Sequence, residues 1–317
     1  MKVLIAPLNW GLGHATRCVP LIRQYLSNGH QVVLAGDGDS ILLLKRYFPD
    51  LRIIDFPALQ LRYTQNKNQR GFYLRALPTL IRFILADHYA LQDLLNRETF
   101  DLVISDNRFG LFSKAVKCVY ITHQLYVQLP NRLKWLSPIA RALHACIYKR
   151  YNEVWVPDYA SKSQNLSGKL SHGGPFDHKA KYIGPLSRFT DFNDTSKPNI
   201  TYNDIAVLSG LEPQRSIFEK EIIRQALIHK EPTLIVQGKI QQPPTSIKRA
   251  NITIVPHFND NELVSAMQHA QHIIARSGYS TIMDLDALGL LKKAQLHPTP
   301  GQSEQEYLAQ HIVNYYG

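Results

Sequence analysis

Short apolar runs alternate with longer segments of helical periodicity in the first half of the chain. Strands are expected at the short runs, Lys2–Ala6, Gln31–Leu34, Arg52–Asp55, Leu102–Ser105, Cys118–Thr122 and Glu153–Val156. Helices are expected at the longer segments, Ala15–Ser27, Ser40–Tyr47, Phe72–Asn96 and Ser137–Lys149. This alternation is typical of a parallel sheet covered by helices, and it predicts one Rossmann-like domain of roughly 185 residues.

A change of composition separates this half from the rest. From Gly184 to Asn203 the chain is rich in Pro, Asn, Asp, Ser and Thr and shows no apolar period. The alternation then restarts, with strands expected at Ile205–Leu208, Thr233–Val236, Ile252–Val255, His272–Ala275 and Ala294–His297. Helices are expected at Ser216–His229, Asn261–His269, Thr281–Leu288 and Glu304–Asn314.

These patterns predict two domains. We expect an N-terminal domain over residues 1–186, a linker over 187–203 and a second parallel α/β domain over 204–317. The last expected helix has no closing segment behind it, a pattern that fits a second domain truncated at the C-terminus.

Composition limits the class of protein. Hydrophobic residues make up 44% of the 317 positions and aromatic residues 10%, which excludes a disordered or fibrous chain. Cys18, Cys118 and Cys146 show no C-x-x-C spacing, so the sequence predicts neither disulfides nor a zinc site and fits a reducing compartment. The longest apolar stretch, Ala76–Leu95, is interrupted by charged residues and is not expected to span a bilayer. We therefore expect a cytoplasmic protein, soluble or peripheral to the inner face of the membrane.

The first expected strand runs directly into the loop NWGLGHATR. Gly11 and Gly13 would let the backbone approach a ligand closely, and the helix start behind them favours negative charge. Thr16 stands where a dinucleotide fingerprint has its third glycine, but Asp37 or Asp39 near the second strand keeps a dinucleotide interpretation open.

The histidine directly after Gly13 is the strongest candidate for chemistry. His14 would lie at the start of a helix above the strand ends, where its neutral imidazole could take a proton from a hydroxyl. Asp106 closes the fourth expected strand, at the correct edge of the sheet to orient that imidazole. Helix capping explains either residue about equally well when each is taken alone.

Two strand-to-helix loops of the second half carry candidate ligand-binding residues. In the first, Ser209, Gly210 and Arg215 would cradle a phosphate, although a simple serine–glycine turn fits as well. The second begins a donor-rich helix start, with Arg276, Ser277, Gly278, Ser280 and Thr281.

Three further polar residues extend this second group. Asp284, one turn into the helix, would accept hydrogen bonds from a ribose. Gln305 and Glu306 lie at the start of the last expected helix and would bind sugar hydroxyls. Loops of this kind at strand ends in both domains predict a nucleotide-sugar site more strongly than any one of them alone.

Together these residues resemble a GT-B glycosyltransferase of family 28, the group that includes the peptidoglycan GlcNAc transferase that makes lipid II. The resemblance covers nearly the whole chain and is most specific in RSG-x-x-T, Asp284, Pro298 and Gln305-Glu306-Tyr307. In that family the corresponding segment holds the diphosphate, ribose and sugar of a UDP-sugar. His257 matches the loop beside the nucleobase.

The resemblance is not uniform along the chain. Family members usually carry a more glycine-rich GG-x-GGH where this chain has GLGH, and Glu where it has Asp284. The loop from Ser209 to Arg215 also lacks the family's usual glycines. The set as a whole also resembles an uncharacterised bacterial and archaeal branch of the family.

The resemblance implies two Rossmann-like, doubly wound parallel-sheet domains that face each other across a cleft, with the donor on the second and the acceptor on the first. It implies inverting transfer of a hexose or N-acetylhexosamine from a UDP-sugar to a hydroxyl acceptor. His14 would be the base, assisted by Asp106, and the helix start at Ser277–Thr281 with Arg276 would take the place of a metal ion. No metal or other cofactor is therefore expected.

Three alternatives stay open. A UDP-sugar hydrolase would use His14 equally well, with water in place of the acceptor. A UDP-GlcNAc 2-epimerase would need more acid–base groups than the sequence identifies. A non-catalytic nucleotide-sugar-binding subunit would make little use of His14 and Asp106 together.

The positive charge is concentrated in one part of the chain. Lys and Arg number 36 against 25 Asp and Glu, a net +11, and residues 60–150 hold 14 against 5, a net +9. One apolar helix face is expected there, formed by Leu77, Leu80, Ile81, Ile84 and Leu91. The resemblance implies a cell-envelope acceptor, lipid-linked, beside an anionic membrane. An ordinary core helix with solvated arginines is the alternative, and nucleic acid is not expected.

Overall fold

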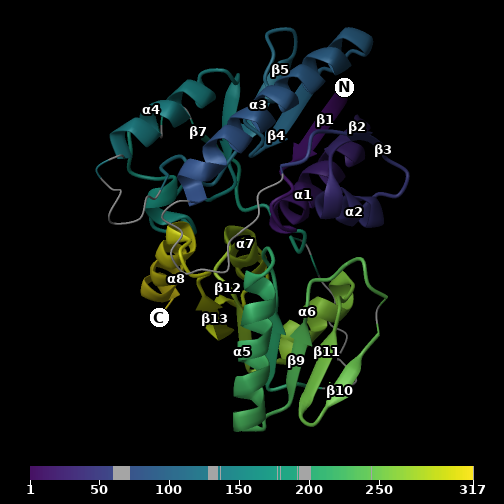
Figure 1. Ribbon diagram of the computed structural model, residues 1–317, viewed down its shortest axis with the longest axis vertical. Coiled ribbons are helices and arrows are strands. Elements are labelled where there is room, and N and C mark those ends of the chain that lie inside the picture. The colour runs from purple at the N-terminus through teal and green to yellow at the C-terminus, as the bar shows by residue number, and fades with distance from the viewer. Residues whose placement is uncertain are drawn as a thin grey trace. The chain divides into compact units, whose positions relative to one another are not determined.

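The computed structural model describes residues 1–59, 72–127, 135, 137–176, 178, 180–190, 192, 201–243 and 245–316, with the backbone alone for 72–76 and 316 (Figure 1). The chain divides into two compact units, Met1–Arg188 and Phe189–Gly317. The expected linker over 187–203 lies partly outside the described residues, and its bounds stay a prediction.

The first unit is built on a seven-stranded sheet in the order β3-β2-β1-β4-β5-β6-β7, and every pairing in it is parallel. The strands are β1 (Lys2–Pro7), β2 (Gln31–Gly36), β3 (Arg52–Asp55), β4 (Leu102–Asp106), β5 (Lys117–Ile121), β6 (Glu153–Val156) and β7 (Ala180–Tyr182). The helices are α1 (Gly13–Ser27), α2 (Gly38–Tyr47), α3 (Phe72–Arg97), α4 (Ser137–Tyr148) and the short 3-10 turn η3 (Gly168–Leu170).

The first strand shows why its sequence forms a central strand of this sheet. Leu4 and Ala6 belong to the core that also contains Leu91 of α3, and the alternate residues Val3 and Ile5 are just as fully buried. Successive side chains of a strand point to opposite faces, so both faces of β1 are covered. A continuous apolar run is what such a strand requires.

The strand order of this sheet reverses between β1 and β4, where the chain winds outward in both directions. In open parallel sheets the crevice at such a reversal is where ligands bind. Pro7 at the end of β1 lies opposite Asp106 at the end of β4, so the loops after these two strands begin side by side.

The second unit holds a six-stranded sheet in the order β10-β11-β9-β8-β12-β13. Its strands are β8 (Asp204–Val207), β9 (Thr233–Val236), β10 (Ile247–Arg249), β11 (Ile252–Val255), β12 (His272–Arg276) and β13 (Ala294–His297). Its helices are α5 (Gln214–His229), α6 (Asp260–His269), α7 (Tyr279–Ala287), α8 (Ser303–Tyr316) and the 3-10 turn η5 (Leu291–Lys293). Here the order reverses between β8 and β12.

The expectation of two doubly wound parallel α/β domains is confirmed, with two additional strands. Strand β7 is only three residues long, AKY, and lacks an apolar run. Strand β10 is antiparallel to β11 and all three of its residues are exposed, so it has none of the apolar pattern that marks a buried strand.

Helix α3 differs from the sequence interpretation. Leu91 is buried, whereas Leu77 and Ile81 are each 49% exposed, so the five apolar residues expected on one face do not share one buried surface. Within the described residues, none of the helices combines the length and the apolar character that crossing a bilayer requires.

Candidate active site

The loop after β1 places His14 at the start of α1. Gly11 has φ of 76°, a left-handed conformation that favours glycine, and it turns the chain from the strand into the helix. Gly13 is the first residue of α1, and its carbonyl accepts a hydrogen bond from the Thr16 hydroxyl at 3.0 Å. His14 follows as the second helical residue, with 14% of its side chain exposed.

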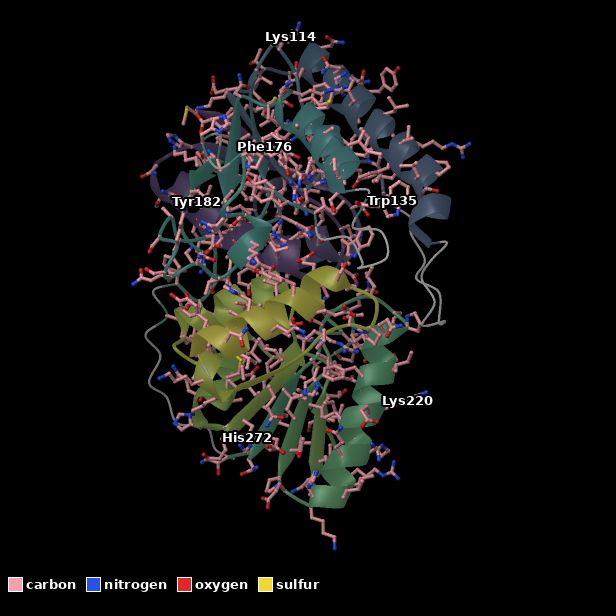
Figure 2. The ribbon with its side chains drawn as sticks, turned by 90° about the vertical axis from the view of Figure 1, so that its left-hand side faces the viewer. Lys114, Trp135, Phe176, Tyr182, Lys220 and His272 are labelled. Carbon is pink, nitrogen blue, oxygen red and sulfur yellow. The ribbon has the colours of Figure 1, made fainter. Side chains whose placement is uncertain are left out.

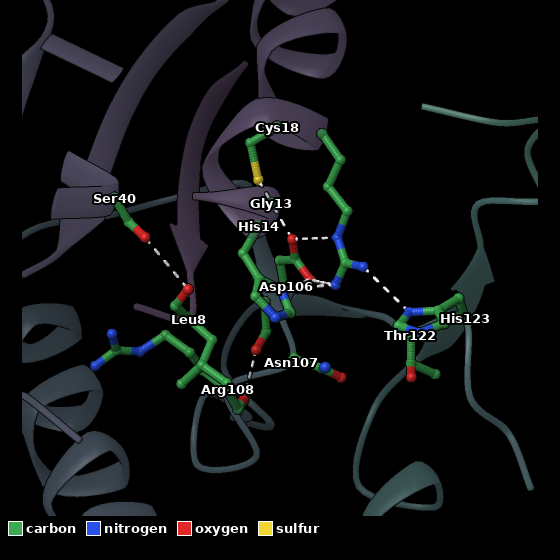
Figure 3. A network of polar contacts seen from close by, with 12 residues as sticks. Leu8, Gly13, His14, Cys18, Ser40, Asp106, Asn107, Arg108, Thr122 and His123 are labelled. Carbon is green, nitrogen blue, oxygen red and sulfur yellow. Dashed lines mark hydrogen bonds and ion pairs between the residues drawn. The ribbon is translucent and has the colours of Figure 1, made fainter. Parts of the chain in front are cut away.

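The structure brings His14 and Asp106 together across the reversal point of the sheet (Figure 3). Nδ1 of His14 lies 3.2 Å from Oδ1 of Asp106, which is fully buried. His14 follows the loop after β1 and Asp106 ends the neighbouring strand β4, so their arrangement follows from the sheet topology. Among the described residues, no hydrogen bond uses Nε2 of His14, which is therefore the nitrogen available to a substrate.

Arg17 lies one helical turn after His14 and contacts both His14 and Asp106. The sequence analysis did not identify it. Its guanidinium binds both oxygens of Asp106, with Nε 2.6 Å from Oδ2 and Nη2 in a short contact with Oδ1. Nη2 also lies 2.8 Å from Nδ1 of His14. The i, i+3 spacing on α1 could have shown that Arg17 and His14 share a helix face.

A second imidazole reaches the same guanidinium. His123, just after β5, places Nδ1 3.2 Å from Nη1 of Arg17 and is almost fully buried. The sequence analysis did not include His123 among the candidate site residues. Its position after the strand next to β4 could have indicated that it lies near Asp106.

The charges in this cluster act strongly on one another. Burial raises the pKa of Asp106, but the Arg17 guanidinium and His14 outweigh it and hold that pKa well below its usual range. Burial lowers the pKa of the His14 imidazole, Arg17 lowers it further, and Asp106 acts in the opposite direction. The net result is a neutral imidazole beside an ionised carboxylate that already has a cationic partner.

The two residues after Asp106 fix its backbone. Asn107 adopts φ of 59°, and its Oδ1 accepts a hydrogen bond from the Tyr120 hydroxyl at 2.8 Å. Arg108 is fully buried and binds the carboxylate of Asp87 on α3, at 3.2 Å for its Nε and 2.5 Å for Nη2. Asp106 is thus held at both its side chain and its adjoining backbone.

Asp37, which follows β2, forms polar contacts within the first unit. Asp37 accepts a hydrogen bond from Nδ2 of Asn9 at 2.9 Å and lies 3.4 Å from Nη1 of Arg108. Asp37 and Asp39 are separated by one residue, as are Asp284 and Asp286 in the second unit. No group of three or more His, Cys, Asp or Glu that could hold a metal ion occurs among the described residues.

In the second unit, the loop after β8 is closed by its own carboxylate. Gly210 has φ of 98°, and the chain then places Glu212 over the start of α5. The Glu212 carboxylate accepts hydrogen bonds from the backbone N–H of Ser216 at 3.2 Å and from its hydroxyl at 3.0 Å. It also pairs with Arg215 at 2.5 Å. Arg215, one of the donors assigned to a phosphate in the Ser209–Arg215 loop, therefore already has an anionic partner within the loop.

The loop after β12 is organised by Arg276. This buried guanidinium donates hydrogen bonds to the carbonyls of Pro298 at 2.9 Å and Gln214 at 3.4 Å and lies 3.9 Å from the centre of the Phe218 ring. Burial lowers the pKa of Arg276 to about 10. Its side chain thus joins the loops that follow β12 and β13 to the start of α5.

The side chains of Ser277 and Gln305 also form hydrogen bonds within the second unit. The Ser277 hydroxyl donates to the Gln305 backbone carbonyl at 2.8 Å, and Oε1 of Gln305 accepts from the Thr299 N–H at 2.8 Å. Gly278 is the N-cap of α7 and provides no side-chain cap. The N-cap position of α7 therefore contributes no capping side chain of its own.

The remaining predicted residues lie on α7, on α8 and in the loop after β11. Ser280, Thr281 and Asp284 are half-buried on α7, and Glu306 is exposed on α8. His257 is half-buried in the loop after β11. Among the predicted residues of this unit, the structure brings Arg276 to the start of α5 and Ser277 to Gln305.

Comparison with known proteins identifies the architecture. The glycosyltransferase of kitacinnamycin matches with a TM-score of 0.60 and 11% identity, covering 100% of this chain and 96% of that one. A Phytolacca americana UGT2, solved with UDP-2-fluoro-glucose and pterostilbene, matches with a TM-score of 0.59 and 13% identity, covering 99% and 83%. The fold is GT-B. The expected GT-B fold class is confirmed by these matches over the full chain.

Sequence relatives agree with this assignment. Two proteins described as uncharacterized glycosyltransferases, from Methanosarcina mazei and Methanosarcina acetivorans, are 22% and 21% identical to this chain. Each match covers 96% of this chain and 82% of the relative. No family model matches the chain. Relatives and structural neighbours together support a glycosyltransferase of GT-B fold, and they do not support family 28 in particular.

Proposed function

We propose that the protein transfers a sugar from a nucleotide-sugar donor to a hydroxyl acceptor with inversion, and that His14 is the base. The observation that supports this most strongly is the His14–Asp106 contact at the reversal point of the first sheet. It supplies a neutral imidazole whose pKa burial lowers, a buried carboxylate beside it, and an Nε2 for which the described residues provide no hydrogen-bond partner.

The reaction needs one proton transfer and one displacement. Nε2 of His14 takes the proton from the acceptor hydroxyl as that oxygen bonds to the anomeric carbon. The bond from that carbon to the diphosphate oxygen breaks on the opposite face, which inverts the configuration. Asp106 stabilises the imidazolium that forms, in the way that the carboxylate of a triad does.

On the donor side we propose that the first turn of α7 binds the diphosphate. Gly278, the N-cap of α7, adds no side chain in front of that helix start, and Ser280 and Thr281 bring hydroxyl groups to its first turn. Arg276 supports this loop from behind, because its guanidinium is bound to the backbone at Pro298 and Gln214.

A UDP-sugar is the donor we propose, with a hexose or N-acetylhexosamine as the transferred sugar. A UDP-2-fluoro-glucose occupies one neighbour of the same fold, and a UDP-L-rhamnose is found with another, Arabidopsis thaliana UGT89C1. Helix N–H groups can stabilise the departing diphosphate without a metal ion, so we propose that the reaction proceeds with chelator present.

For the acceptor we propose a lipid-linked molecule of the cell envelope, reached at the inner face of an anionic membrane. Leu77, Ile81, Leu85 and Tyr89 follow one another at four-residue intervals on α3 and are 49%, 49%, 49% and 68% exposed. On α4, Ile139 and Leu143 are 56% and 61% exposed, and Trp135 before it is 73% exposed (labelled in Figure 2). The net +9 of residues 60–150 would attract anionic headgroups to these side chains.

The decisive experiment is a panel of nucleotide sugars with the purified protein in the presence of EDTA. Thermal shift and release of the nucleotide would be measured without acceptor. A UDP-sugar-specific shift with slow release of UDP is the expected result. Fast release of UDP and free sugar would instead establish a hydrolase, with water in place of the acceptor. A 2-epimerised sugar would establish the epimerase, and binding without turnover under any acceptor would leave a binding subunit.

The membrane surface has its own test. Sedimentation with vesicles of phosphatidylglycerol and phosphatidylcholine should recover the wild-type protein and lose the Ile81→Ser/Leu85→Ser variant. Leu227→Ser on α5 is the matched control, because Leu227 is 40% exposed and lies in the second unit. Equal recovery of all three proteins would contradict the proposed membrane contact.

A further inference from the structure

The position of Arg17 has a consequence for the protonation of His14. A guanidinium always carries its protons and can only donate hydrogen bonds. Its Nη2 has two hydrogens, and two acceptor atoms lie within reach: Oδ1 of Asp106 in a short contact, and Nδ1 of His14 at 2.8 Å. Each of these acceptors can take one of the two hydrogens.

The contact between His14 and Asp106 competes with this arrangement. At 3.2 Å, Nδ1 of His14 can donate to Oδ1 of Asp106 only if Nδ1 carries the proton. It can accept from Arg17 only if Nδ1 holds a lone pair. One nitrogen cannot do both, so the two contacts belong to two tautomers of the neutral ring.

The shorter contact selects between these tautomers. We propose that Arg17 is a positioning residue that holds resting His14 as the tautomer with its proton on Nε2. Nδ1 then accepts from Arg17, and the 3.2 Å between Nδ1 and Asp106 is the separation of two acceptors that share one amino group. His123 takes the same tautomer, since its Nδ1 faces Nη1 of Arg17 at 3.2 Å.

This inference rests on the proposed function for its catalytic meaning. The base requires a lone pair on Nε2, so the ring has to change tautomer before it can accept a proton from the acceptor. In that change Nε2 releases its proton to a solvent water, and Nδ1 takes a proton from a water molecule and donates it to Asp106. Arg17 and Asp106 are both already in contact with Nδ1, so the exchange needs little movement of the ring. Arg17 thereby holds the resting ring neutral and without a lone pair on Nε2.

The charged groups around His14 come from three elements. Arg17 and Cys18 lie on the same helix, Asp106 lies at the end of β4, and His123 follows β5. Cys18 donates to Oδ2 of Asp106 at 3.7 Å, and burial raises the pKa of its thiol, so it is neutral. Removal of Arg17 therefore leaves Asp106 as the single fixed charge acting on the imidazole and should raise the pKa of His14.

The test reads the tautomer directly and needs no enzymatic activity. Two-bond ¹⁵N–¹H correlations of ¹⁵N-histidine-labelled protein distinguish the two neutral tautomers, and the His14→Gln variant identifies the His14 signals by their loss. The wild-type protein at pH 8 should show the Nε2–H form of His14. A resting Nδ1–H form would overturn the proposal, whatever reaction the protein catalyses.

Variants then separate positioning from a structural role. In Arg17→Met the His14 signals should change to the Nδ1–H form, and the ring should titrate about one pH unit or more above wild type. His123→Asn, the matched control, should leave the His14 tautomer unchanged. The activity of Arg17→Met relative to wild type should rise with pH, whereas a structural defect would lower it equally at all pH values. If Arg17→Met does not fold, Arg17→Lys keeps the charge, and the wild-type tautomer remains decisive.

Discussion

Both units place a buried arginine near the point where the strand order of the sheet reverses, but this arginine has different partners in each unit. In the first unit, side chains at the reversal point bind one another, as Arg17 does with Asp106 and His14. In the second unit, the buried guanidinium at the equivalent point, that of Arg276, binds the backbone carbonyls of Pro298 and Gln214. The first arrangement places an imidazole beside a buried ion pair, and the second joins the loops after β12 and β13 to the start of α5.

The two arrangements should also differ in how much stability is lost when one partner is removed. A buried ion pair contributes little net stability, because the desolvation of both charges offsets their attraction, yet loss of one partner is strongly destabilising. A buried guanidinium bound to neutral carbonyls is less sensitive, since each lost hydrogen bond costs about 1–3 kcal/mol. Substitutions in the two units should therefore differ in size and in what they affect.

The largest effect is expected at His14. His14→Ala should lower turnover by about 10²- to 10⁴-fold because the acceptor proton loses its base. Nucleotide-sugar binding should be retained, because the donor site is proposed on the second unit. Steady-state kinetics and isothermal titration with the same UDP-sugar check both statements. Equal turnover in wild type and variant would remove His14 from the reaction.

The next largest effect is on stability, at Asp106. Asp106→Asn leaves Arg17 buried without its anion and should lower the free energy of unfolding by about 3–5 kcal/mol. The double variant Arg17→Met/Asp106→Asn removes both charges and should recover most of this loss. Chemical denaturation of the three proteins measures it, and a double variant no more stable than Asp106→Asn would show that the charge pair is not the cause.

The same carboxylate predicts an acid sensitivity. Its pKa is held well below the usual range in the folded state, so its contribution to stability is present above about pH 4, the unfolded value. That contribution is lost progressively as the pH falls below this value. Unfolding at pH 7, 4 and 3 should show a smaller acid loss for Arg17→Met/Asp106→Asn than for wild type. Parallel losses would assign the acid sensitivity to other groups.

Arg276 provides the corresponding change in the second unit. Arg276→Met keeps the contact with Phe218 but leaves the carbonyls of Pro298 and Gln214 without their donor, which should cost about 1–3 kcal/mol. Affinity for a UDP-sugar should fall because the loop before α7 is less well held. A strong affinity loss with unchanged stability would instead indicate direct contact between Arg276 and the diphosphate.

The fold could be predicted from the sequence where apolar residues repeat regularly. Strands β3, β6, β9, β11 and β13 have the expected bounds, because each is a short run between clear helix or turn segments. Strands β7 and β10 could not be predicted, since their backbone pairing with a neighbour defines them and their side chains carry no apolar pattern. Pairing with a distant segment leaves no local mark in the sequence.

The sequence showed which loops form the candidate site, but it did not show all the side chains that bind one another there. His14 and Asp106 could be paired because parallel strands end at one edge of the sheet. Arg17 was overlooked because an arginine in a helix is usually solvated, and only its full burial shows otherwise. The sequence analysis assigned Arg276 to ligand binding, because the sequence does not show that its guanidinium reaches backbone carbonyls 22 and 62 residues away.

The smallest expected effects come from two neighbours on α8. Gln305 accepts a hydrogen bond from the Thr299 N–H, so Gln305→Ala should lower the free energy of unfolding by about 1 kcal/mol. Glu306 is exposed, and Glu306→Ala should change stability by less than about 0.5 kcal/mol. If Glu306 binds a sugar hydroxyl, its variant should raise KM for the UDP-sugar, whereas Gln305→Ala should act through the loop.

This pair divides the second unit into residues that hold its loops and residues that meet a ligand. Thermal unfolding and steady-state kinetics on the same preparations make the division measurable. A fall in stability without a change in KM for Gln305→Ala, and the reverse for Glu306→Ala, would place the sugar at the exposed face of α8. A stability loss for Glu306→Ala equal to that of Gln305→Ala would mean that both side chains are structural, and that the sugar contacts must be sought on α7, around Asp284.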